Sequence, residues 1–131
     1  MPTMRPFLMF QKGDAEAAMT LYISLFDDGE IIDTVRWQTG EPGKEGSIKL
    51  AKFRAAGQTV FVSDSPVKHA FEFTPSSSFF VDCGSKEELE RLFAALGDGG
   101  AILMPPDNYG FSQRFGWVND RFGVSWQINL P

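Results

Sequence analysis

The chain repeats itself, and this internal repeat restricts its fold more than any other feature of the sequence. Between residues 18 and 26 apolar side chains recur at intervals of three, four, seven and eight, the spacing of a helix packed on a core. The pattern returns 71 residues later, between residues 89 and 96, and the same offset carries the run 7–10 onto 78–81. Because chance rarely aligns so many positions, the sequence predicts two copies of one module. The expected core-facing helix residues are Ala18, Leu21, Tyr22, Leu25 and Phe26, then Leu89, Leu92, Phe93 and Leu96.

Each copy is predicted to fold as a strand, a helix and three further strands, a βαβββ module. A unit of about 60 residues is marginally stable alone, so the two copies should pack together. The prediction is an α+β fold in one domain, 1–131, whose tandem modules at about 4–65 and 76–131 form a curved, open, eight-stranded sheet. The expected elements are 5–11, 14–26, 30–38, 46–54 and 58–64, then 77–83, 85–96, 101–104, 112–119 and 124–130, with loops at 39–45, 65–76 and 105–110.

The repeat also aligns the predicted starts of the two helices. It carries Asp14 onto Ser85, and both are residue types that cap helices. Ser85 and Glu88 have the spacing of a capping box. We therefore interpret Asp14 and Ser85 as capping residues.

Strand alternation divides the strand residues between two faces, because neighbouring side chains point to opposite sides of a sheet. Trp126 and the other apolar residues of its parity in the last strand are predicted to cover the helix. By the repeat, Leu8, Phe10, Val60, Val62, Phe79, Val81 and Cys83 also face a helix. The opposite set should line a cavity: Phe7, Met9, Gln11, Thr59, Phe61, Ser63, Ser78, Phe80, Asp82, Ser125, Gln127 and Asn129.

The C-terminal segment 109–130 carries the resemblance to a known family. Two alternating, aromatic-rich runs meet at an Asp-Arg-Phe-Gly turn, residues 120–123, which is typical of a β-hairpin. Read with residues 7–18, this hairpin resembles the PhnB-like branch of the glyoxalase, bleomycin-resistance and dioxygenase superfamily, also called the vicinal oxygen chelate superfamily. The resemblance covers nearly the whole chain. It implies the paired-module architecture. It also implies a homodimer, because relatives commonly complete their cavities across a two-fold axis or by exchanging modules. Independently of the resemblance, open sheet edges favour pairing with a second chain.

The resemblance also implies where a metal would bind. Metal-using members of the superfamily place a His or Gln on the first strand of each half and a Glu on the last strand. In this sequence the corresponding places fall on Phe7, Phe61, Ser78 and Gln127. Phenylalanine has no lone pair to donate, serine is a poor divalent-metal ligand, and a neutral amide is a weak one. We therefore expect no metal or other cofactor at these places. If a metal is found, the first alternative ligands are Asp64, Asp82 and His69.

Two residues with reactive side chains have simpler explanations. His69, the single histidine, lies in the segment between the modules and is expected to be a solvated loop residue rather than a catalytic base. Cys83 is the single cysteine and is expected to be a buried, inert thiol. An unpaired cysteine fits a reducing compartment.

Charge and hydropathy exclude two classes of partner. The net charge is −5, and the basic residues are scattered rather than clustered, which argues against binding to nucleic acid. No apolar run approaches the roughly 20 residues needed to span a bilayer, and the start of the chain lacks a signal-peptide core. The expected location is the cytoplasm.

What remains is an aromatic pocket with a few polar groups, the usual composition of a small-molecule site. The alternative is that the thirteen phenylalanines simply fill the core of a small domain. Trp37 belongs to the same aromatic set. The predicted ligand-binding residues are Phe7, Phe61, Ser63, Ser78, Phe80, Tyr109, Arg114, Trp117 and Gln127.

Two functions agree with such a pocket. The favoured hypothesis is a protein that binds a small aromatic or amphipathic molecule and has lost the metal site. The alternative is an enzyme of the same superfamily, of lyase, dioxygenase or PhnB-like type, that acts on a glyoxal, phosphonate-related or ring-bearing substrate. Some family members carry a demethylubiquinone methyltransferase label, but no Gly-rich motif follows a strand here to hold a nucleoside cofactor.

Overall fold

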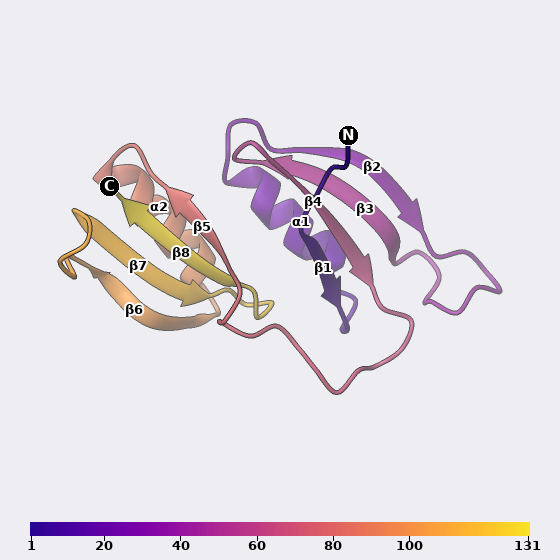
Figure 1. The fold of residues 1–131 in the computed structure, drawn as a ribbon. Coiled ribbons are helices and arrows are strands. Elements are labelled where there is room, and N and C mark those ends of the chain that lie inside the picture. Colours follow the sequence, from indigo (N-terminus) through magenta and orange to yellow (C-terminus); the bar gives the residue numbers. More distant parts are fainter. The chain divides into compact units, whose positions relative to one another are not determined.

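The structure, a computed structural model, describes residues 1–131 as two compact units (Figure 1). Unit 1 is Met1–Ala70 and unit 2 is Phe71–Pro131. Each unit holds one complete βαβββ module, so the predicted repeat is confirmed. No helix of the chain has both the length and the apolar character that a membrane crossing requires.

Unit 1 consists of a four-stranded sheet and one helix. Its elements are β1 (Phe7–Phe10), α1 (Ala15–Ser24), β2 (Glu30–Arg36), β3 (Ile48–Ala55) and β4 (Gln58–Asp64). The strand order is β1-β4-β3-β2, in which β1 runs parallel to β4 and the other pairs are antiparallel.

Unit 2 has the same arrangement. Its elements are β5 (Ser78–Asp82), α2 (Lys86–Gly97), β6 (Ala101–Asp107), β7 (Arg114–Asn119) and β8 (Ser125–Leu130). The strand order is β5-β8-β7-β6, with β5 parallel to β8. The eight expected strands are therefore present, hydrogen-bonded as one four-stranded sheet in each unit.

One strand runs through a predicted loop. The expectation ended this strand at Met104, but β6 continues through Pro105 and Pro106 to Asp107. Proline has no backbone N–H, and it is tolerated in a sheet on an edge strand, which β6 is. The irregular pairing of β6 with β7 after Met104 fits that explanation.

Each helix covers one face of its own sheet. In α2 the four predicted residues Leu89, Leu92, Phe93 and Leu96 are all buried. In α1 the buried stripe is Ala15, Ala18, Met19 and Tyr22, so the prediction was wrong in part: Leu21 and Phe26 are only half-buried, and Met19 was missed. The Tyr22 ring packs against Phe53 of β3 with ring centroids 6.0 Å apart.

The predicted helix-facing parity is confirmed for the last strand of each unit. Val60 and Val62 of β4 are buried, as are Trp126 and Ile128 of β8. In β7 the same side of the sheet holds Gly116, where a Cβ atom would lie 2.7 Å from the Phe93 ring of α2. The residues of opposite parity therefore lie on the face away from the helix, which we call the open face of each unit.

The two modules differ by a two-residue slide between their parallel strands. Phe7 lies directly opposite Phe61, whereas Ser78 lies opposite Ser125 and Phe80 opposite Gln127. The sequence match had aligned Phe61 with Gln127, which is not the partner of Ser78. A shift of two residues keeps every side chain on its own face, so the assignment of faces survives the slide.

The helix starts differ from the prediction in one place. Ser85 caps α2 as expected, because its Oγ accepts a hydrogen bond from the Glu88 N–H at 3.1 Å. Asp14 stands at the N-cap position of α1, but its side chain makes no capping hydrogen bond. The capping interpretation of Asp14 was therefore wrong, and the N–H of Ala15 is satisfied by Asp64 instead.

Candidate functional site

The open face of unit 2 arranges nine side chains in three rungs across β5, β8 and β7. The pairing of β5 with β8 and of β8 with β7 places one residue of each strand in every rung. Four of the nine residues that the sequence predicted for the site are in this grid: Ser78, Phe80, Trp117 and Gln127. The rungs are Ser78–Ser125–Asn119, Phe80–Gln127–Trp117 and Asp82–Asn129–Phe115.

The central rung sets an amide between two aromatic side chains. Gln127 is half-buried and lies between Phe80 on β5 and Trp117 on β7. Its Nε2 donates a hydrogen bond diagonally to Ser78 Oγ at 3.3 Å. Its Oε1 takes no hydrogen bond from the protein. The amide therefore has a fixed orientation and a carbonyl oxygen available to an incoming donor.

The first rung continues this polar contact as a relay of hydroxyl groups. The Trp117 indole N–H donates to Ser125 Oγ at 2.8 Å, and Ser125 Oγ lies 2.7 Å from Ser78 Oγ. An indole N–H can only donate. If the Ser125 hydroxyl then donates to Ser78, the Ser78 hydroxyl hydrogen points onward, with only the carbonyl of Pro75 near it, at 3.5 Å. Ser125 is 1% exposed and Ser78 is half-buried, so Ser78 is the accessible end of the relay.

An aromatic cluster surrounds the third rung. The Phe115 ring makes edge contacts with Tyr109 and Phe111, at centroid distances of 6.2 and 5.0 Å, and lies 6.3 Å from Phe80. Phe115 itself is 4% exposed, whereas Phe80 is 55% exposed, and Tyr109 and Phe111 are exposed too. The Tyr109 hydroxyl donates to the Pro105 carbonyl at 2.5 Å, which fixes the ring over β6. Exposed aromatic rings on a buried base form a surface for a planar apolar ligand.

Two amide oxygens of the grid are buried without a partner. Asn129 Nδ2 donates to Asp82 Oδ1 at 2.9 Å, but Asn129 Oδ1 accepts nothing. Asn119 Oδ1, in the first rung, is also buried and unpaired. A buried polar atom without a hydrogen bond costs roughly 1–3 kcal/mol, so such atoms mark places where water or a ligand donor is favourable.

The open face of unit 1 carries three more predicted residues, Phe7, Phe61 and Ser63. Phe7 is exposed and lies opposite Phe61, which lies opposite Lys52. The Lys52 Nζ stands 6.0 Å from the centroid of the Phe61 ring, a cation–π contact. Ser63 donates its hydroxyl hydrogen to the carbonyl of Lys49 at 2.9 Å, so that donor is used within the protein.

One predicted site residue does not reach an open face. Arg114 has the parity of Gly116 and Val118, which pack toward α2. Its Nε donates to Glu90 Oε1 of α2 at 2.7 Å, an ion pair on the helix side of the sheet. The prediction chose Arg114 for its chemistry. Strand alternation would have excluded it and would have selected Phe115, which sequence reasoning missed.

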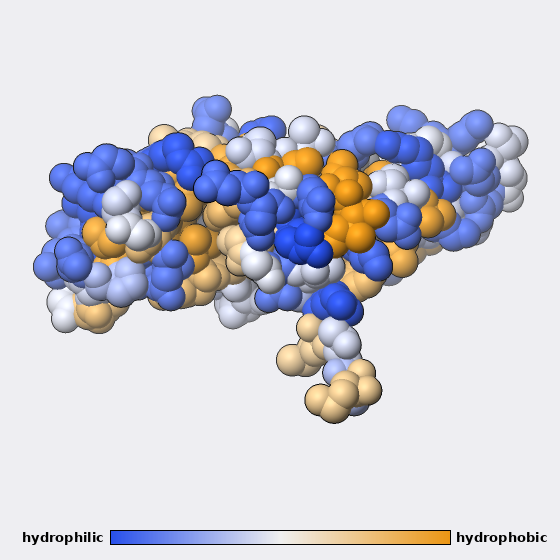
Figure 2. All heavy atoms as spheres, turned by 90° about the horizontal axis from the view of Figure 1, so that it is seen from above, coloured by the Kyte–Doolittle hydropathy of each residue, from blue (hydrophilic) through white to orange (hydrophobic).

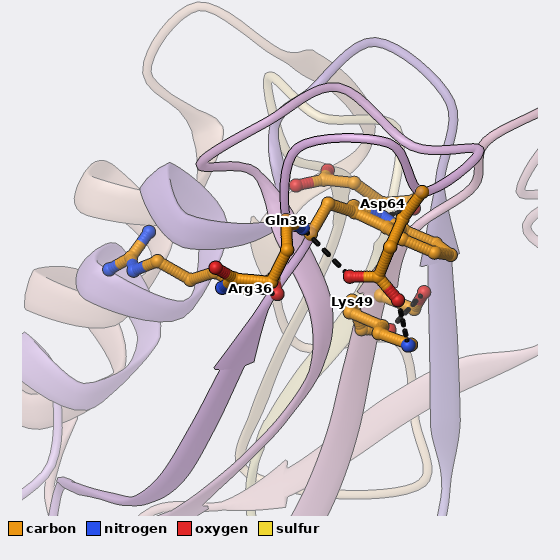
Figure 3. Close-up of polar contacts among 7 residues, drawn as sticks. Arg36, Gln38, Lys49 and Asp64 are labelled. Carbon is orange, nitrogen blue, oxygen red and sulfur yellow. Dashed lines mark hydrogen bonds and ion pairs between the residues drawn. The ribbon is translucent and has the colours of Figure 1, made fainter.

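Trp37 is held by unit 1 in a structural role. Its indole N–H donates to the backbone carbonyl of Asp64 at 3.0 Å, and the Lys49 ammonium lies 5.2 Å from its ring centroid. A Cβ at Gly43 would lie 2.2 Å from the ring, so the loop closes directly over it. Figure 3 shows Gln38 and Lys49 bonded to one carboxylate, that of Glu41, while Arg36 extends away toward a helix. These contacts fix the loop around Trp37.

The two residues with reactive side chains are both held by their surroundings. His69 lies in the segment that follows β4, as expected, but it is half-buried: its Nε2 is 3.2 Å from Ser65 Oγ. Its backbone N–H donates to Gln11 Oε1 at 2.5 Å. Cys83 is buried, as predicted, and this burial, with the Glu88 and Asp82 carboxylates nearby, raises the pKa of its thiol to about 11. Such a thiol is a poor nucleophile at neutral pH.

The places of the superfamily's metal ligands do not present a metal-binding donor set. Phe7 and Phe61 are directly opposed and offer only rings. Ser78 Oγ already contacts Ser125 and Gln127. None of the four places supplies a carboxylate or an imidazole. Nowhere in the chain do three His, Cys, Asp or Glu side chains gather in a way that could hold an ion. The residues present therefore do not fit the superfamily's metal.

Comparison with known proteins supports one family along almost the entire chain. The family model for 3-demethylubiquinone-9 3-methyltransferase matches residues 2–129. A solved Bacillus cereus structure, described as a candidate 3-demethylubiquinone-9 3-methyltransferase and PhnB protein, is 47% identical to this chain. The two superpose with a TM-score of 0.95 over 99% of this chain and 100% of that one.

Two further matches are more limited. Protein YjdN of Escherichia coli (strain K12) is 31% identical over 84 residues, 64% of this chain, and the match spans only 56% of YjdN. The fosfomycin resistance protein FosX of Listeria monocytogenes, solved with Mn(II) and 1S,2S-dihydroxypropylphosphonic acid, is 11% identical. It superposes with a TM-score of 0.67 over 99% of this chain and 92% of FosX, which makes it similar in fold.

Proposed function

Because the chain belongs to the 3-demethylubiquinone-9 3-methyltransferase family, a PhnB-like part of the vicinal oxygen chelate superfamily, we propose that it binds a small aromatic or amphipathic molecule without the superfamily's metal. The observation that carries the proposal is the central rung of unit 2. There Gln127, with a free carbonyl oxygen, lies between Phe80 and Trp117.

The chemistry of this face suits orientation of a ligand more than bond cleavage. Exposed rings of Phe80, Tyr109 and Phe111 offer apolar area, and Gln127 offers a carbonyl acceptor beside the Ser78 hydroxyl. No histidine, cysteine or lysine belongs to the grid, and its one carboxylate, Asp82, is exposed and bonded to Asn129. A face with apolar rings and a few oriented polar groups is the usual form of a binding site.

Phe7, Phe61 and Ser63 are proposed as the ligand-contacting residues of a separate surface, on unit 1. The exposed Phe7 ring and the Phe61 ring beneath Lys52 provide its aromatic area. Replacing Phe7 by Ala should weaken binding at this surface without unfolding the protein, since its ring is mostly in solvent.

The test of the proposal starts from the native protein. Native mass spectrometry of protein purified without chelator should show a co-purifying organic molecule, and elemental analysis should find less than about one-tenth of an equivalent of zinc, nickel, manganese or iron. Gln127→Ala should lose the organic adduct, and Glu87→Gln on the exposed first turn of α2 should keep it. A stoichiometric metal, removed by chelator with a fall in melting temperature, would contradict the proposal.

The name of the matching family favours a second candidate function, methyl transfer. That reaction requires a methyl donor, which in this class of chemistry is a nucleoside cofactor. Calorimetry with S-adenosylmethionine tests it directly. Binding with a dissociation constant below about 100 μM would favour the enzyme, whereas no detectable heat would favour a binding protein. A lyase or dioxygenase of the superfamily is the remaining enzymatic alternative, and it would require the metal that elemental analysis seeks.

We also propose that the chain forms a homodimer. Exposed aliphatic side chains lie on the outer strand of each sheet, and surface hydrophobic atoms stand out as orange patches in Figure 2. On β2 these are Ile31, Ile32 and Val35, and on β6 Ile102 and Leu103. Exposed aliphatic edge strands favour association, and soluble oligomers are mostly closed dimers.

Light scattering at micromolar concentration tests the dimer. A mass of about twice 14.6 kDa is expected, and Ile32→Lys should lower it toward that of one chain. Glu87→Lys, on the helix, should leave it unchanged. A 14.6 kDa species at every concentration would contradict the dimer.

We further propose a cytoplasmic location, because the free, buried Cys83 agrees with a reducing compartment.

A further inference from the structure

The open face of unit 2 combines a lone carboxylate with unpaired carbonyl oxygens and no cation. Resting on the proposed binding function, we infer that this face selects aromatic ligands that donate hydrogen bonds and carry no negative charge, with a protonated amine preferred over a hydroxyl group. Anionic ligands such as carboxylates or phosphonates are disfavoured.

The distribution of charge is the first argument. Unit 2 contains eight Asp and Glu residues but only four basic ones. None of the four serves the open face: Lys86 and Arg91 lie on α2, which covers the other face. Arg114 is paired with Glu90, and the Arg121 guanidinium lies 4.7 Å from the ring centroid of Phe122 in the β7–β8 turn. The one charged residue of the grid is Asp82, which is exposed.

The hydrogen-bond inventory is the second argument. Three N–H groups of the grid already donate within it, from Trp117 to Ser125, from Gln127 to Ser78 and from Asn129 to Asp82. Three amide oxygens, Gln127 Oε1, Asn119 Oδ1 and Asn129 Oδ1, accept nothing. Asn129 is 8% exposed, so its unpaired oxygen is a buried acceptor rather than a solvated one.

These two observations act in the same direction. A ligand N–H or O–H can satisfy Gln127 Oε1, the one unpaired amide oxygen of the three that is not buried, and an ammonium group gains further from the exposed Asp82 carboxylate. A ligand anion must shed water without meeting a cation and is repelled by Asp82. The second N–H of each amide group can still donate to a neutral acceptor on the ligand. The face therefore tolerates neutral acceptors, and it selects for ligand donors and against negative charge.

A matched series of ligands tests the inference by calorimetry at pH 7. The three probes are 1-naphthalenemethylamine, 1-naphthalenemethanol and 1-naphthoate, which share one ring system and differ in charge. The amine should bind most tightly and the alcohol next, with 1-naphthoate at least tenfold weaker than the amine. Asp82→Asn should reduce the affinity for the amine until it is within about threefold of the affinity for the alcohol.

The control removes the same charge elsewhere. Glu87→Gln, on the exposed first turn of α2, should leave all three affinities unchanged. If Asp82→Asn and Glu87→Gln weaken the amine equally, the preference comes from net charge and the assignment to this face is overturned. If 1-naphthoate binds most tightly of the three, the inference is overturned while the proposed function stands. If Lys52→Met then abolishes the binding of 1-naphthoate, the ligand is recognised on unit 1. If none of the three probes binds, the proposed function fails and the inference fails with it.

Discussion

The carboxylate of Asp64, the last residue of β4, accepts a hydrogen bond at 3.0 Å from the backbone N–H of Ala15, the first residue of α1. Its second oxygen accepts from the N–H of Ile48 at 2.9 Å, where β3 begins. One buried carboxylate thus joins the helix start to two strands of the sheet. The helix N-terminus favours that negative charge.

Removing this carboxylate should destabilise unit 1. Asp64→Ala leaves two N–H groups unpaired and is expected to lower the free energy of unfolding by roughly 2–4 kcal/mol. Asp14→Ala, at the N-cap position of the same helix, should change it by less than about 0.5 kcal/mol, because that side chain makes no capping bond. Urea unfolding of both variants measures the difference. A larger loss from Asp14→Ala would mean that the helix is capped locally.

Two adjacent residues of β8 should respond oppositely to truncation. Trp126 is 4% exposed, packs against Phe79 with ring centroids 4.7 Å apart, and donates its indole N–H to Asp120 at 3.0 Å. Trp126→Ala should cost roughly 3–5 kcal/mol of stability. Gln127→Ala loses one long hydrogen bond on the open face and should cost less than about 1 kcal/mol while weakening ligand binding. A collapse of Gln127→Ala, with binding intact in its folded fraction, would identify Gln127 as a core residue.

The Cys83 thiol should resist alkylation. Since its pKa is raised to about 11, the thiolate is scarce at pH 8. Iodoacetamide at pH 8 should label the folded protein at least tenfold more slowly than the urea-unfolded protein. The raised pKa stabilises the fold fully below the ordinary thiol pKa, and this contribution is lost as the pH rises to about 11. Equal labelling rates for the folded and unfolded protein would contradict the burial of the thiol.

Asp28 should contribute to the loss of stability in acid. Hydrogen bonds from the N–H groups of Gly57 and Ala56, in the β3–β4 turn, hold its pKa below the ordinary value. A lowered pKa gives stability that is present above the ordinary carboxyl pKa and is lost as the pH falls through the folded value. Between about pH 5 and 2, Asp28→Asn should lose less stability than the wild type. Asp27→Asn, beside it, should follow the wild type, and identical curves for all three proteins would remove Asp28 from the account.

The sequence predicted the modules well because their signals are local. Ser85 and Glu88 mark the start of α2 within four residues, and the apolar spacing of α2 fixes its buried stripe. The stripe of α1 was predicted in part: Ala18, Tyr22 and Leu25 are buried as expected, but Ala15 and Met19 were missed because they are weaker signals than the nearby Leu21, which is only half-buried. The contact of Asp64 with Ala15 joins residues 49 apart, so no spacing rule reveals it.

The candidate site was predictable where strand parity was applied and not elsewhere. Parity placed Ser78, Phe80 and Gln127 on one face, and the pairing of β5 with β8 agrees. It was not applied to β7, so Arg114 was chosen and Phe115 missed. Which residues stand directly opposite one another depends on the two-residue slide between modules, which follows from loop geometry rather than from pattern.

The most direct test of the account uses the three indole N–H groups as reporters in two-dimensional NMR. Trp37 donates to Asp64, Trp126 to Asp120, and only Trp117 donates on the open face of unit 2, to Ser125. The signals are assigned with Trp37→Phe, Trp117→Phe and Trp126→Phe. On titration with 1-naphthalenemethanol, the Trp117 signal should shift to saturation while those of Trp37 and Trp126 stay in place, and Gln127→Ala should weaken the response. Saturable binding that leaves Trp117 unmoved and shifts Trp37 or Trp126 would contradict the site.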